Sequence, residues 1–142
     1  MIICGFFFPN LSISETRKIL TTKFNEVNVR NGPGLGHLKI YKILKKGYPL
    51  MIIDQFENWK KVRDVNGTLG WVSNSQLSEN KYGIIITKKE FIFKFPEFKS
   101  KKIAIISQNY VIKIKKCIEN WCLVTENDIK GWVQKKSLWG FE

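Results

Sequence analysis

Apolar and polar residues alternate in short runs along most of this chain, and clusters of turn-forming residues separate the runs. Alternation with a period of two over four to eight residues predicts a β-strand with one buried face. The run Glu26–Arg30 is an example, and the turn-rich segment Asn31–Gly36 follows it. No helical period persists long enough to compete with this pattern, so the sequence predicts an all-β protein.

The first half of the chain contains enough of these runs for one small domain. Strands are expected at 26–30, 38–44, 50–54, 59–63 and 69–72, and a single helical turn is expected at 73–77. Asn66-Gly67, between the last two strands, is the strongest hairpin signal in the chain. Five or six short strands within about 55 residues are typical of a small barrel or sandwich.

A repeated pair of tripeptides indicates that the chain contains this unit twice. Glu57-Asn58-Trp59 recurs as Glu119-Asn120-Trp121, and Gly70-Trp71-Val72 recurs as Gly131-Trp132-Val133. The spacings of 62 and 61 residues are too long for a solenoid repeat and suit a very small β domain. The question of function therefore becomes what a tandem of these units does.

The repeat predicts where the domains begin and end. The expected parts are a lead-in at 1–23, a first barrel at 24–79, a connecting segment at 80–87 and a second, diverged barrel at 88–142. Strands of the second copy are expected at 102–106, 111–116, 121–125 and 131–133. Phe91-Ile92-Phe93 takes the place of Val27-Asn28-Val29, and Phe95-Pro96 takes the place of Gly32-Pro33. The apolar run Ile84-Ile85-Ile86 predicts a further strand that connects the copies and packs them together.

The excess of basic residues favours anionic partners but does not identify one class of them. The 24 lysine and arginine residues exceed the 12 acidic residues, which gives a net charge of +12. Such a surplus favours nucleic acid, acidic glycans or anionic lipid headgroups. The lysines are scattered, however, and neither a zinc-finger spacing nor a basic helix accompanies them. A compositional bias toward Ile, Lys, Asn and Phe is the stronger interpretation, and nucleic-acid binding is not expected.

The first residues have two interpretations. Ile2–Ile13 is an apolar stretch that is too short to span a bilayer as a helix. It resembles the end of a signal-peptide apolar region, with Ser12-Ile13-Ser14 as the cleavage site, but it lacks the basic segment that precedes such a region. The alternative is an ordinary N-terminal strand. We expect export to the periplasm or cell envelope, because the first copy begins near Phe24 without this stretch.

Two cysteines flank a predicted turn in the second copy. Cys117 and Cys122 enclose the four residues 118–121. If those residues form a hairpin turn, the cysteines face each other on antiparallel strands at a distance within disulfide range. The corresponding pair in the first copy, Gln55 and Lys60, does not form a crosslink. The alternative is two unpaired thiols, and export would favour the disulfide.

The first copy closely resembles a bacterial SH3-like domain. Four elements of that family's pattern appear in order and are followed by Leu77; they are Asn28-Val29-Arg30-Asn31-Gly32-Pro33-Gly34, Lys46-Gly47, Asn58-Trp59 and Gly70-Trp71-Val72. The second copy keeps Asn120-Trp121, Gly131-Trp132-Val133 and Leu138 but loses the first element, so it resembles a diverged copy. The resemblance implies two tandem small SH3-like barrels. The arrangement is similar to tandem proteins of this type in alphaproteobacteria, which are usually exported.

The resemblance also implies a function, namely a non-catalytic module that binds peptidoglycan or its peptide stems and uses no cofactor. The alternative is a scaffold that docks on envelope proteins through the second copy. That copy carries Phe91, Phe93, Phe95 and Phe98, which either pack against the first copy or form an exposed docking patch. His37 is the only histidine and no second cysteine pair exists, so neither a catalytic triad nor a metal site is expected.

The expected ligand-binding residues all lie in the first copy; they are Asn28, Arg30, Gly32, Pro33, Gly34, Tyr41, Tyr48, Trp59 and Trp71. Arg30 is the strongest candidate, because a guanidinium holds a carboxylate through two hydrogen bonds and peptide stems present carboxylates. Its alternative is an ion pair with Glu26 or Asp54. The glycines of the first loop indicate a turn with positive φ or a close backbone approach. The tryptophans either contact ligand or close the barrel, and the tyrosines either line a groove or pack at its rim.

Overall fold

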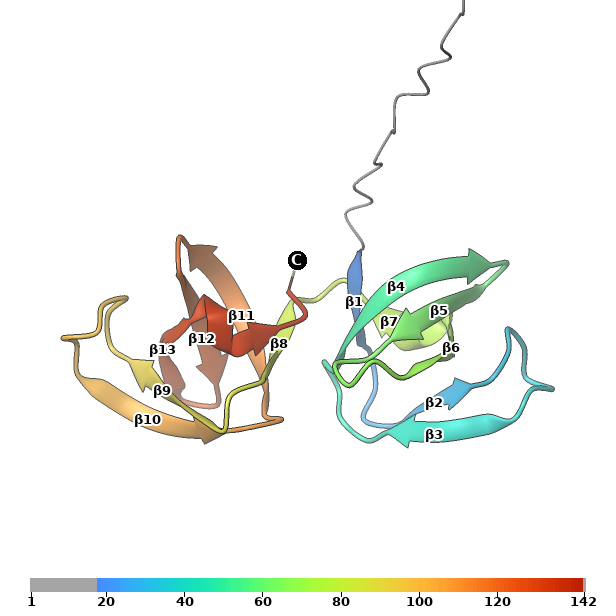
Figure 1. Cartoon of the computed structure of the whole chain (residues 1–142), viewed down its shortest axis with the longest axis horizontal. Helices are drawn as coiled ribbons and strands as arrows, with labels where there is room; N and C mark the ends of the chain where they lie inside the picture. Colours follow the sequence, from blue (N-terminus) through green and yellow to red (C-terminus); the bar gives the residue numbers. More distant parts are fainter. Residues whose placement is uncertain (1–17, 142) are drawn as a thin grey trace, which may run out of the picture.

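The computed structural model describes residues 18–141, which form two small all-β barrels joined in tandem (Figure 1). The first barrel comprises β1 (Ile19–Thr22), β2 (Val27–Arg30), β3 (Lys39–Ile43), β4 (Pro49–Phe56), β5 (Trp59–Arg63), β6 (Leu69–Ser73), the 3-10 turn η1 (Asn74–Gln76) and β7 (Leu77–Ser78). The second comprises β8 (Tyr82–Ile85), β9 (Lys89–Phe93), β10 (Lys102–Ser107), β11 (Val111–Ile118), β12 (Trp121–Glu126), β13 (Ile129–Gln134), the 3-10 turn η2 (Lys135–Ser137) and β14 (Leu138–Trp139). The all-β prediction is confirmed.

The two barrels have the same topology. The strand order is β3-β2-β6-β5-β4-β1-β7 in the first sheet and β10-β9-β13-β12-β11-β8-β14 in the second. Every recorded strand pair is antiparallel. The repeat detected in the sequence is therefore a repeat of a complete seven-stranded unit, and β3 and β10 lie at corresponding edges.

Each barrel encloses its own apolar core, because one face of each strand alternates inward. The fully buried members of the first core are Val27, Val29, Leu50, Val62 and Val72. The second core is larger and includes Ile85, Ile92, Ile112, Cys122, Val124 and Val133. Burying one such side chain contributes about 1.5–3 kcal/mol to stability. Two separate cores support the interpretation of two folding units.

Each sheet begins earlier in the chain than the repeat indicated. β1 pairs with β4 and β7, although its residues fall in the expected lead-in. β8 pairs with β11 and β14, although its residues fall in the expected connecting segment. Neither strand contains one of the Glu-Asn-Trp and Gly-Trp-Val tripeptides that revealed the repeat, so both strands were visible only as apolar residues outside it. The connection between the sheets is correspondingly short, from residue 79 to residue 81.

The alignment of the two copies at β2 and β9 was wrong by one residue. Phe93 pairs with Trp132 in the second sheet, and its counterpart Arg30 pairs with Trp71 in the first. Ile92 therefore corresponds to Val29, and both are buried. A one-residue shift in a strand exchanges its two faces. The corrected register places Phe91 and Phe93 at the positions of Asn28 and Arg30.

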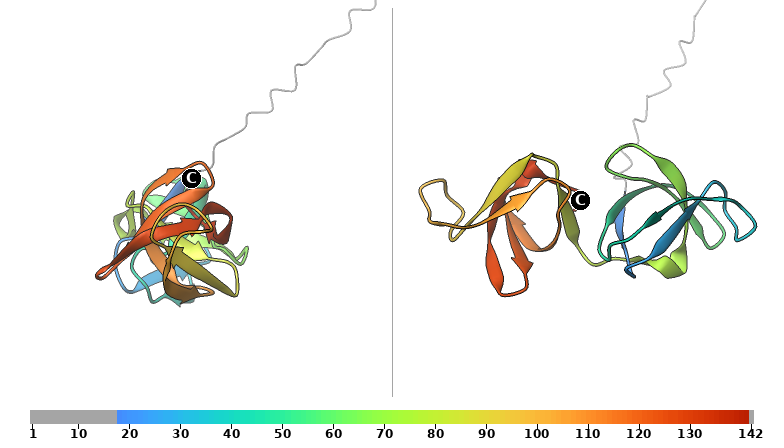
Figure 2. Two further views of the ribbon diagram at one scale, coloured as in Figure 1. Left: turned by 90° about the vertical axis from the view of Figure 1, so that its left-hand side faces the viewer. Right: turned by 90° about the horizontal axis from the view of Figure 1, so that it is seen from below.

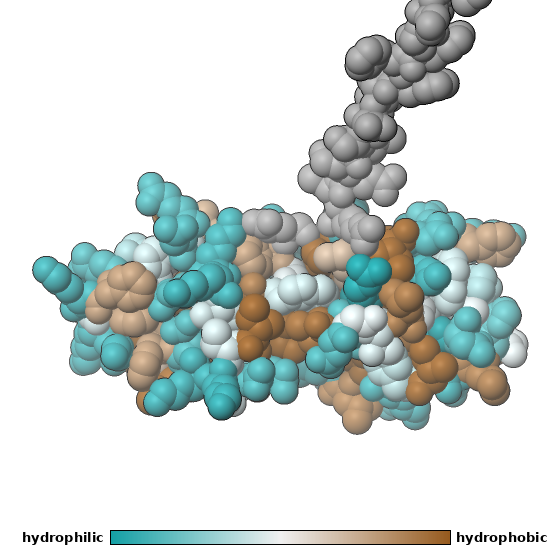
Figure 3. All heavy atoms as spheres, viewed as in Figure 1, coloured by the Kyte–Doolittle hydropathy of each residue, from teal (hydrophilic) through white to brown (hydrophobic). Residues whose placement is uncertain are grey.

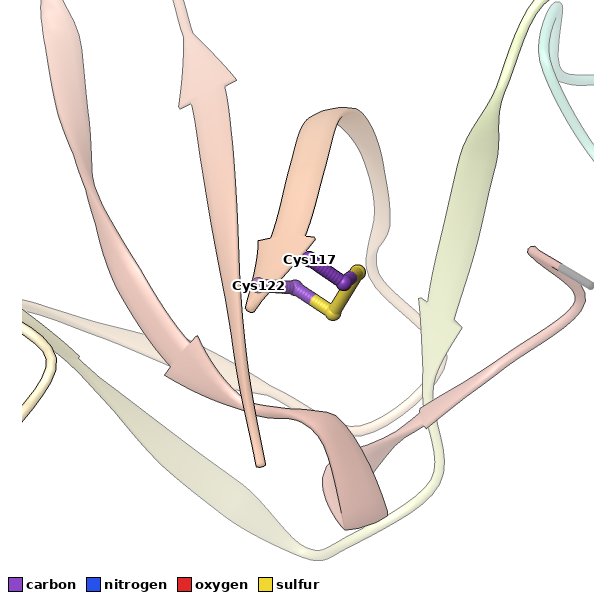
Figure 4. Close-up of a disulfide and its surroundings, with 2 residues drawn as sticks. All are labelled: Cys117 and Cys122. Atoms are coloured by element: carbon purple, nitrogen blue, oxygen red, sulfur yellow. A yellow bond between two sulfur atoms is a disulfide. The ribbon is translucent and has the colours of Figure 1, made fainter. Parts of the chain in front are cut away.

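Cys117 and Cys122 form a disulfide across the β11–β12 hairpin (Figure 4). They are opposed in the strand register, and Cys122 lies fully inside the second core. At the corresponding place in the first barrel, the Lys60 ammonium donates to the Gln55 side-chain oxygen. The same hairpin is thus closed by a covalent bond in one barrel and by a polar contact in the other.

The barrels touch through two glycines that leave no room for a side chain. A Cβ atom on Gly47 would lie 2.6 Å from the Tyr82 ring, and one on Gly140 would lie 2.3 Å from the Pro49 ring. The β2–β3 loop and the β9–β10 loop lie at opposite ends of the molecule in Figure 1 and in the view from below (Figure 2, right). Of the two alternatives for Phe91, Phe93, Phe95 and Phe98, packing against the first barrel is therefore ruled out.

Candidate ligand groove of the first barrel

A groove of about 620 Å³ opens at the outer end of the first barrel. Its walls come from β2, the β2–β3 loop, the start of β5, the end of β6 and η1. The lining residues are Asn28, Arg30, Leu35, Trp59, Ser73, Ser75 and Gln76. Five of these seven side chains are polar, and Arg30 is the single charged one. The groove is therefore suited to an extended polar ligand with an anionic group, and one aromatic wall is available for apolar contact.

Arg30 organises the loop that forms one wall of the groove. Its Nη1 atom donates to the carbonyl oxygens of Leu35 at 3.1 Å and His37 at 3.0 Å. The alternative role of Arg30, an ion pair with Glu26 or Asp54, is not seen, since Glu26 accepts from Lys42 and Asp54 accepts from the backbone N–H of Gln55. A guanidinium carries five N–H donors, and one of its nitrogens suffices for these two bonds. The remaining donors can serve a ligand.

Asn28 supplies an acceptor next to this donor. Its Oδ1 atom is buried and has no hydrogen-bond partner among the described residues. An unpaired buried oxygen costs about 1–3 kcal/mol, so a ligand N–H group that reaches it recovers stability. The hydroxyl groups of Ser73 and Ser75, 3.1 Å apart, add further donors and acceptors on the opposite wall.

The first loop owes its shape to one histidine. A Cβ atom on Gly32 would lie 2.4 Å from the His37 ring, and Gly32 is buried. Its φ is not positive, nor is that of Gly34, so close approach is the reason for glycine at position 32. Gly34 completes a local turn by accepting from the His37 N–H at 3.2 Å. Pro33 and both glycines support the wall without lining the groove.

Tyr41 and Tyr48 do not line this groove, which corrects the expectation from the sequence. Both pack against the core of the first barrel, and Tyr41 donates to the buried Asp64 at 3.1 Å. Asp64 also accepts from the backbone N–H groups of Asn66 and Thr68, so it holds the β5–β6 turn. Burial, with the charge of Asp64 beside it, raises the pKa of Tyr41 above its usual range and raises the pKa of Tyr48.

The two tryptophans have different positions. Trp59 lines the groove at the first residue of β5, directly after the Glu57-Asn58 turn, in which Glu57 has a φ of 50°. Trp71 is on β6 opposite Arg30 and is not among the lining residues. The sequence-based choice therefore brings together Asn28, Arg30 and Trp59. It missed Leu35, Ser73, Ser75 and Gln76, of which the last three were visible only as polar residues in the predicted helical turn.

Aromatic side chains occupy the same place in the second barrel. Phe93 replaces Arg30, and its ring centroid lies 5.3 Å from that of Trp121, the counterpart of Trp59. Phe98, 63 residues after Leu35, lies 5.1 Å from the same tryptophan. Edge-to-face pairs of this kind contribute about 0.5–1.5 kcal/mol beyond burial. Phe93 is buried by these contacts, so the second barrel uses this position for packing.

The described residues contain no other cluster with evident chemistry. No group of three or more His, Cys, Asp and Glu side chains within residues 18–141 has the geometry to hold a metal ion. No helix in that range is long and apolar enough to cross a membrane. The expected signal sequence lies outside the described residues.

Comparison with known proteins gives one family. A model of the bacterial SH3 domain matches residues 23–79 and again residues 88–140. These two matches cover most of the chain, and one falls in each barrel, although they begin after β1 and β8. Among curated proteins, none matches this chain.

Three solved structures that match this chain come from larger proteins. NlpC1 from Trichomonas vaginalis is 16% identical with a TM-score of 0.40, over 89% of this chain and 47% of that chain. NlpC2 from the same organism is 17% identical with a TM-score of 0.40, over 87% and 48%. An NlpC/P60 family protein from Bacillus cereus ATCC 10987 is 13% identical with a TM-score of 0.38, over 86% and 56%. The chain thus spans about half the length of these proteins, and similarity this low transfers no activity to it.

Proposed function

Since the chain belongs to the bacterial SH3 domain family in both of its barrels, we propose that it is a cell-wall-related binding protein whose first barrel recognises peptidoglycan through its peptide stems. The family supports a binding module related to the cell wall, and the groove supports the choice of ligand. The proposal includes export to the cell envelope, where that ligand is found.

The observation that carries the proposal is that Asn28 and Arg30, two residues apart on one face of β2, have complementary hydrogen-bonding groups available. The Asn28 Oδ1 atom lacks a donor, and the Arg30 guanidinium has donors beyond those that hold the loop. A stem peptide supplies amide N–H groups for the first and free carboxylates for the second. Charge-assisted bonds to a guanidinium contribute about 1.5–3 kcal/mol each, so Arg30 is expected to dominate affinity.

The remaining walls suit the rest of such a ligand. Trp59 offers an apolar face for an aliphatic side chain, and Ser73, Ser75 and Gln76 face it with small polar groups. Among the described residues, the groove lining contains no histidine that could act as a general base. The ring of His37 packs on Gly32, and the His37 backbone carbonyl accepts a hydrogen bond from Arg30. Binding without catalysis is therefore the proposed activity.

Sedimentation with insoluble peptidoglycan tests the proposal. Purified protein is mixed with sacculi at about 50 mM and about 500 mM salt, and the pelleted fraction is measured. We expect retention at both salt concentrations, because a shaped groove depends less on screening than scattered lysines do. Arg30→Ala should weaken retention about tenfold. The matched control is Arg63→Ala, which removes the same charge from β5 outside the groove.

Two results would contradict this assignment. Complete loss of binding at high salt in the unmodified protein would leave only charge as the cause. Equal weakening by Arg30→Ala and Arg63→Ala would show that the groove contributes nothing beyond its charge.

A further inference from the structure

The free edge of the second sheet differs from that of the first in its outward side chains. β10 is the terminal strand of its sheet, and six residues make it longer than the five-residue β3. Ile105 on β10 is 61% exposed and Ile103 is 38% exposed. Long apolar edge strands are rare in soluble proteins, because they present unpaired backbone groups and an apolar surface to other chains.

The corresponding edge of the first barrel carries charge at this place. Lys42 stands opposite Asn28 in the first barrel, whereas Ile105 stands opposite Phe91 in the second. Lys42 is further occupied by Glu26 at 2.8 Å. Lysine on an edge strand is a common guard against strand addition, and the second barrel lacks it at this position.

Ammonium groups surround the apolar edge. The Nζ atom of Lys102 lies 4.1 Å from the centroid of the Phe91 ring, and that of Lys89 lies 5.5 Å from it. Lys94 is placed similarly over the exposed Phe95. Among residues 88–107 there are six lysines and two glutamates, and one of the glutamates, Glu90, is buried against Ser137. The surface therefore combines apolar contact with unneutralised positive charge.

We propose that the free edge of β10 binds an extended, carboxylate-rich segment of a partner protein, which adds to the second sheet as a further strand. Backbone hydrogen bonds to β10 provide the main attachment, as in other cases of strand addition. Apolar side chains of the segment lie beside Ile105 and Ile103, and its carboxylates meet Lys89 and Lys102. A second copy of this chain is the poorer occupant, since it brings the same positive charge to the contact.

The position of this edge gives the proposal a functional meaning. The β9–β10 loop lies at the opposite end of the molecule from the β2–β3 loop (Figures 1 and 2), and Leu35 of the latter loop lines the groove. Apolar atoms appear among hydrophilic ones at that end of the second barrel (Figure 3). A ligand in the groove and a strand on β10 can therefore be held at once, which makes the chain a link between them. The β10 site does not depend on the proposed function of the first barrel.

A short labelled peptide that carries glutamate and valine in turn at every second residue, with threonine between them, tests the proposal on the full chain in the absence of wall material. This spacing places the glutamates and valines on one face of the added strand, as Lys89, Lys102 and Ile105 require. Fluorescence anisotropy measures its affinity, and amide-resolved NMR locates it. We expect binding that weakens at least about tenfold when alternate peptide amides are N-methylated, since strand addition needs them. Ile105→Thr, which keeps strand propensity, and Lys102→Gln should each weaken binding several-fold. The NMR signals of Lys102–Ser107 should shift and exchange more slowly.

Matched controls come from the edge of the first barrel. Ile40→Thr and Lys39→Gln on β3 should leave peptide binding unchanged. Equal binding of the N-methylated peptide, or of a polyglutamate without valine, would overturn the proposal in favour of charge alone. Absence of binding, or dimerisation of the protein that Ile105→Thr abolishes, would overturn it as well.

Discussion

The two barrels have the same strand order but differ in the side chains beside one equivalent tryptophan, Trp59 in the first and Trp121 in the second. In the first, Trp59 faces a groove whose other walls are Arg30, Asn28 and small polar residues. In the second, Phe93 and Phe98 contact Trp121, and the place of the groove is taken by aromatic packing. The same fold thus accommodates either a polar groove or aromatic packing beside this tryptophan. The fold persisted because the core valines, isoleucines and glycines lie on the opposite strand face.

The largest effects on stability are expected for alanine substitutions of the equivalent glycines Gly70 and Gly131. A Cβ on Gly131 would lie 2.5 Å from the Ile92 side chain and 2.6 Å from the Phe93 carbonyl oxygen, whereas one on Gly70 would lie 2.3 Å from the Val29 side chain and 3.2 Å from the Arg30 carbonyl oxygen. Gly131→Ala should therefore destabilise the second barrel by about 3 kcal/mol or more, and Gly70→Ala the first by about 2 kcal/mol. Urea unfolding followed by amide-resolved NMR measures both. Equal losses would show that backbone approach is not the deciding contact.

Reduction of the disulfide should affect one barrel only. The Cys117–Cys122 bond closes a short loop, for which loop-closure entropy predicts about 2 kcal/mol of stabilisation. The first barrel has the Lys60–Gln55 contact at that place and should be unaffected by a reductant. Unfolding with and without dithiothreitol, monitored separately for the two barrels, gives the difference. A reductant effect of similar size on the first barrel would mean that the barrels unfold as one unit.

A third prediction concerns a substitution that gives the first barrel the residue found at the same strand position of the second. Arg30→Phe introduces the residue that the second barrel has, and it should reduce binding to sacculi about tenfold while leaving the first barrel folded, because Phe93 shows that this strand position tolerates an aromatic ring. Far-ultraviolet circular dichroism provides the folding control. Undiminished binding by this variant would place the ligand elsewhere.

The smallest expected effect is a loss of stability of the first barrel at alkaline pH. In the folded protein the pKa of Tyr41 is raised by burial and by Asp64, while in the unfolded chain it stays near 10. Above that pH the unfolded state loses a proton that the folded state retains, so the stability of the first barrel falls as pH rises. Ala104 replaces Tyr41 in the second barrel, and its Tyr110 is more exposed.

Tyr41→Phe should weaken the alkaline dependence of the first barrel and cost about 1 kcal/mol at neutral pH, through the lost hydrogen bond to Asp64. Urea midpoints between neutral pH and about pH 11 test this. A steeper fall in the second barrel than in the first would contradict the account.

Much of the fold could be predicted from the sequence, because its signals are local. β5 begins at Trp59, where the Asn-Trp pair predicted a strand, and η1 lies inside the predicted helical turn. A model of the bacterial SH3 domain matches both copies, and the duplicated Asn-Trp and Gly-Trp-Val landmarks were sufficient to predict this family. The register at β9 was missed because Phe91-Ile92-Phe93 is apolar throughout, so it has no alternation to show which residue faces the core.

The groove was harder to predict than the fold, since its walls come together only in three dimensions. Arg30 and Asn28 lie on a recognisable motif, whereas Ser73 and Ser75 are ordinary polar residues until η1 turns them toward Trp59. Tyr41 and Tyr48 looked equally suited to a ligand, but the buried Asp64 binds one and adjoins the other. A carboxylate two residues before Asn66-Gly67 was the available signal, because aspartate there commonly caps a turn.

The central claim is that the first barrel holds the ligand and that the aromatic packing of the second excludes it. An NMR titration of the full chain with a soluble peptidoglycan fragment that carries its stem peptide tests this most directly. We expect the signals of Asn28, Arg30, the Trp59 indole and residues 73–76 to shift, and those of Phe93, Phe98 and Trp121 to stay in place. Shifts centred on Trp121, with the groove of the first barrel unchanged, would contradict it.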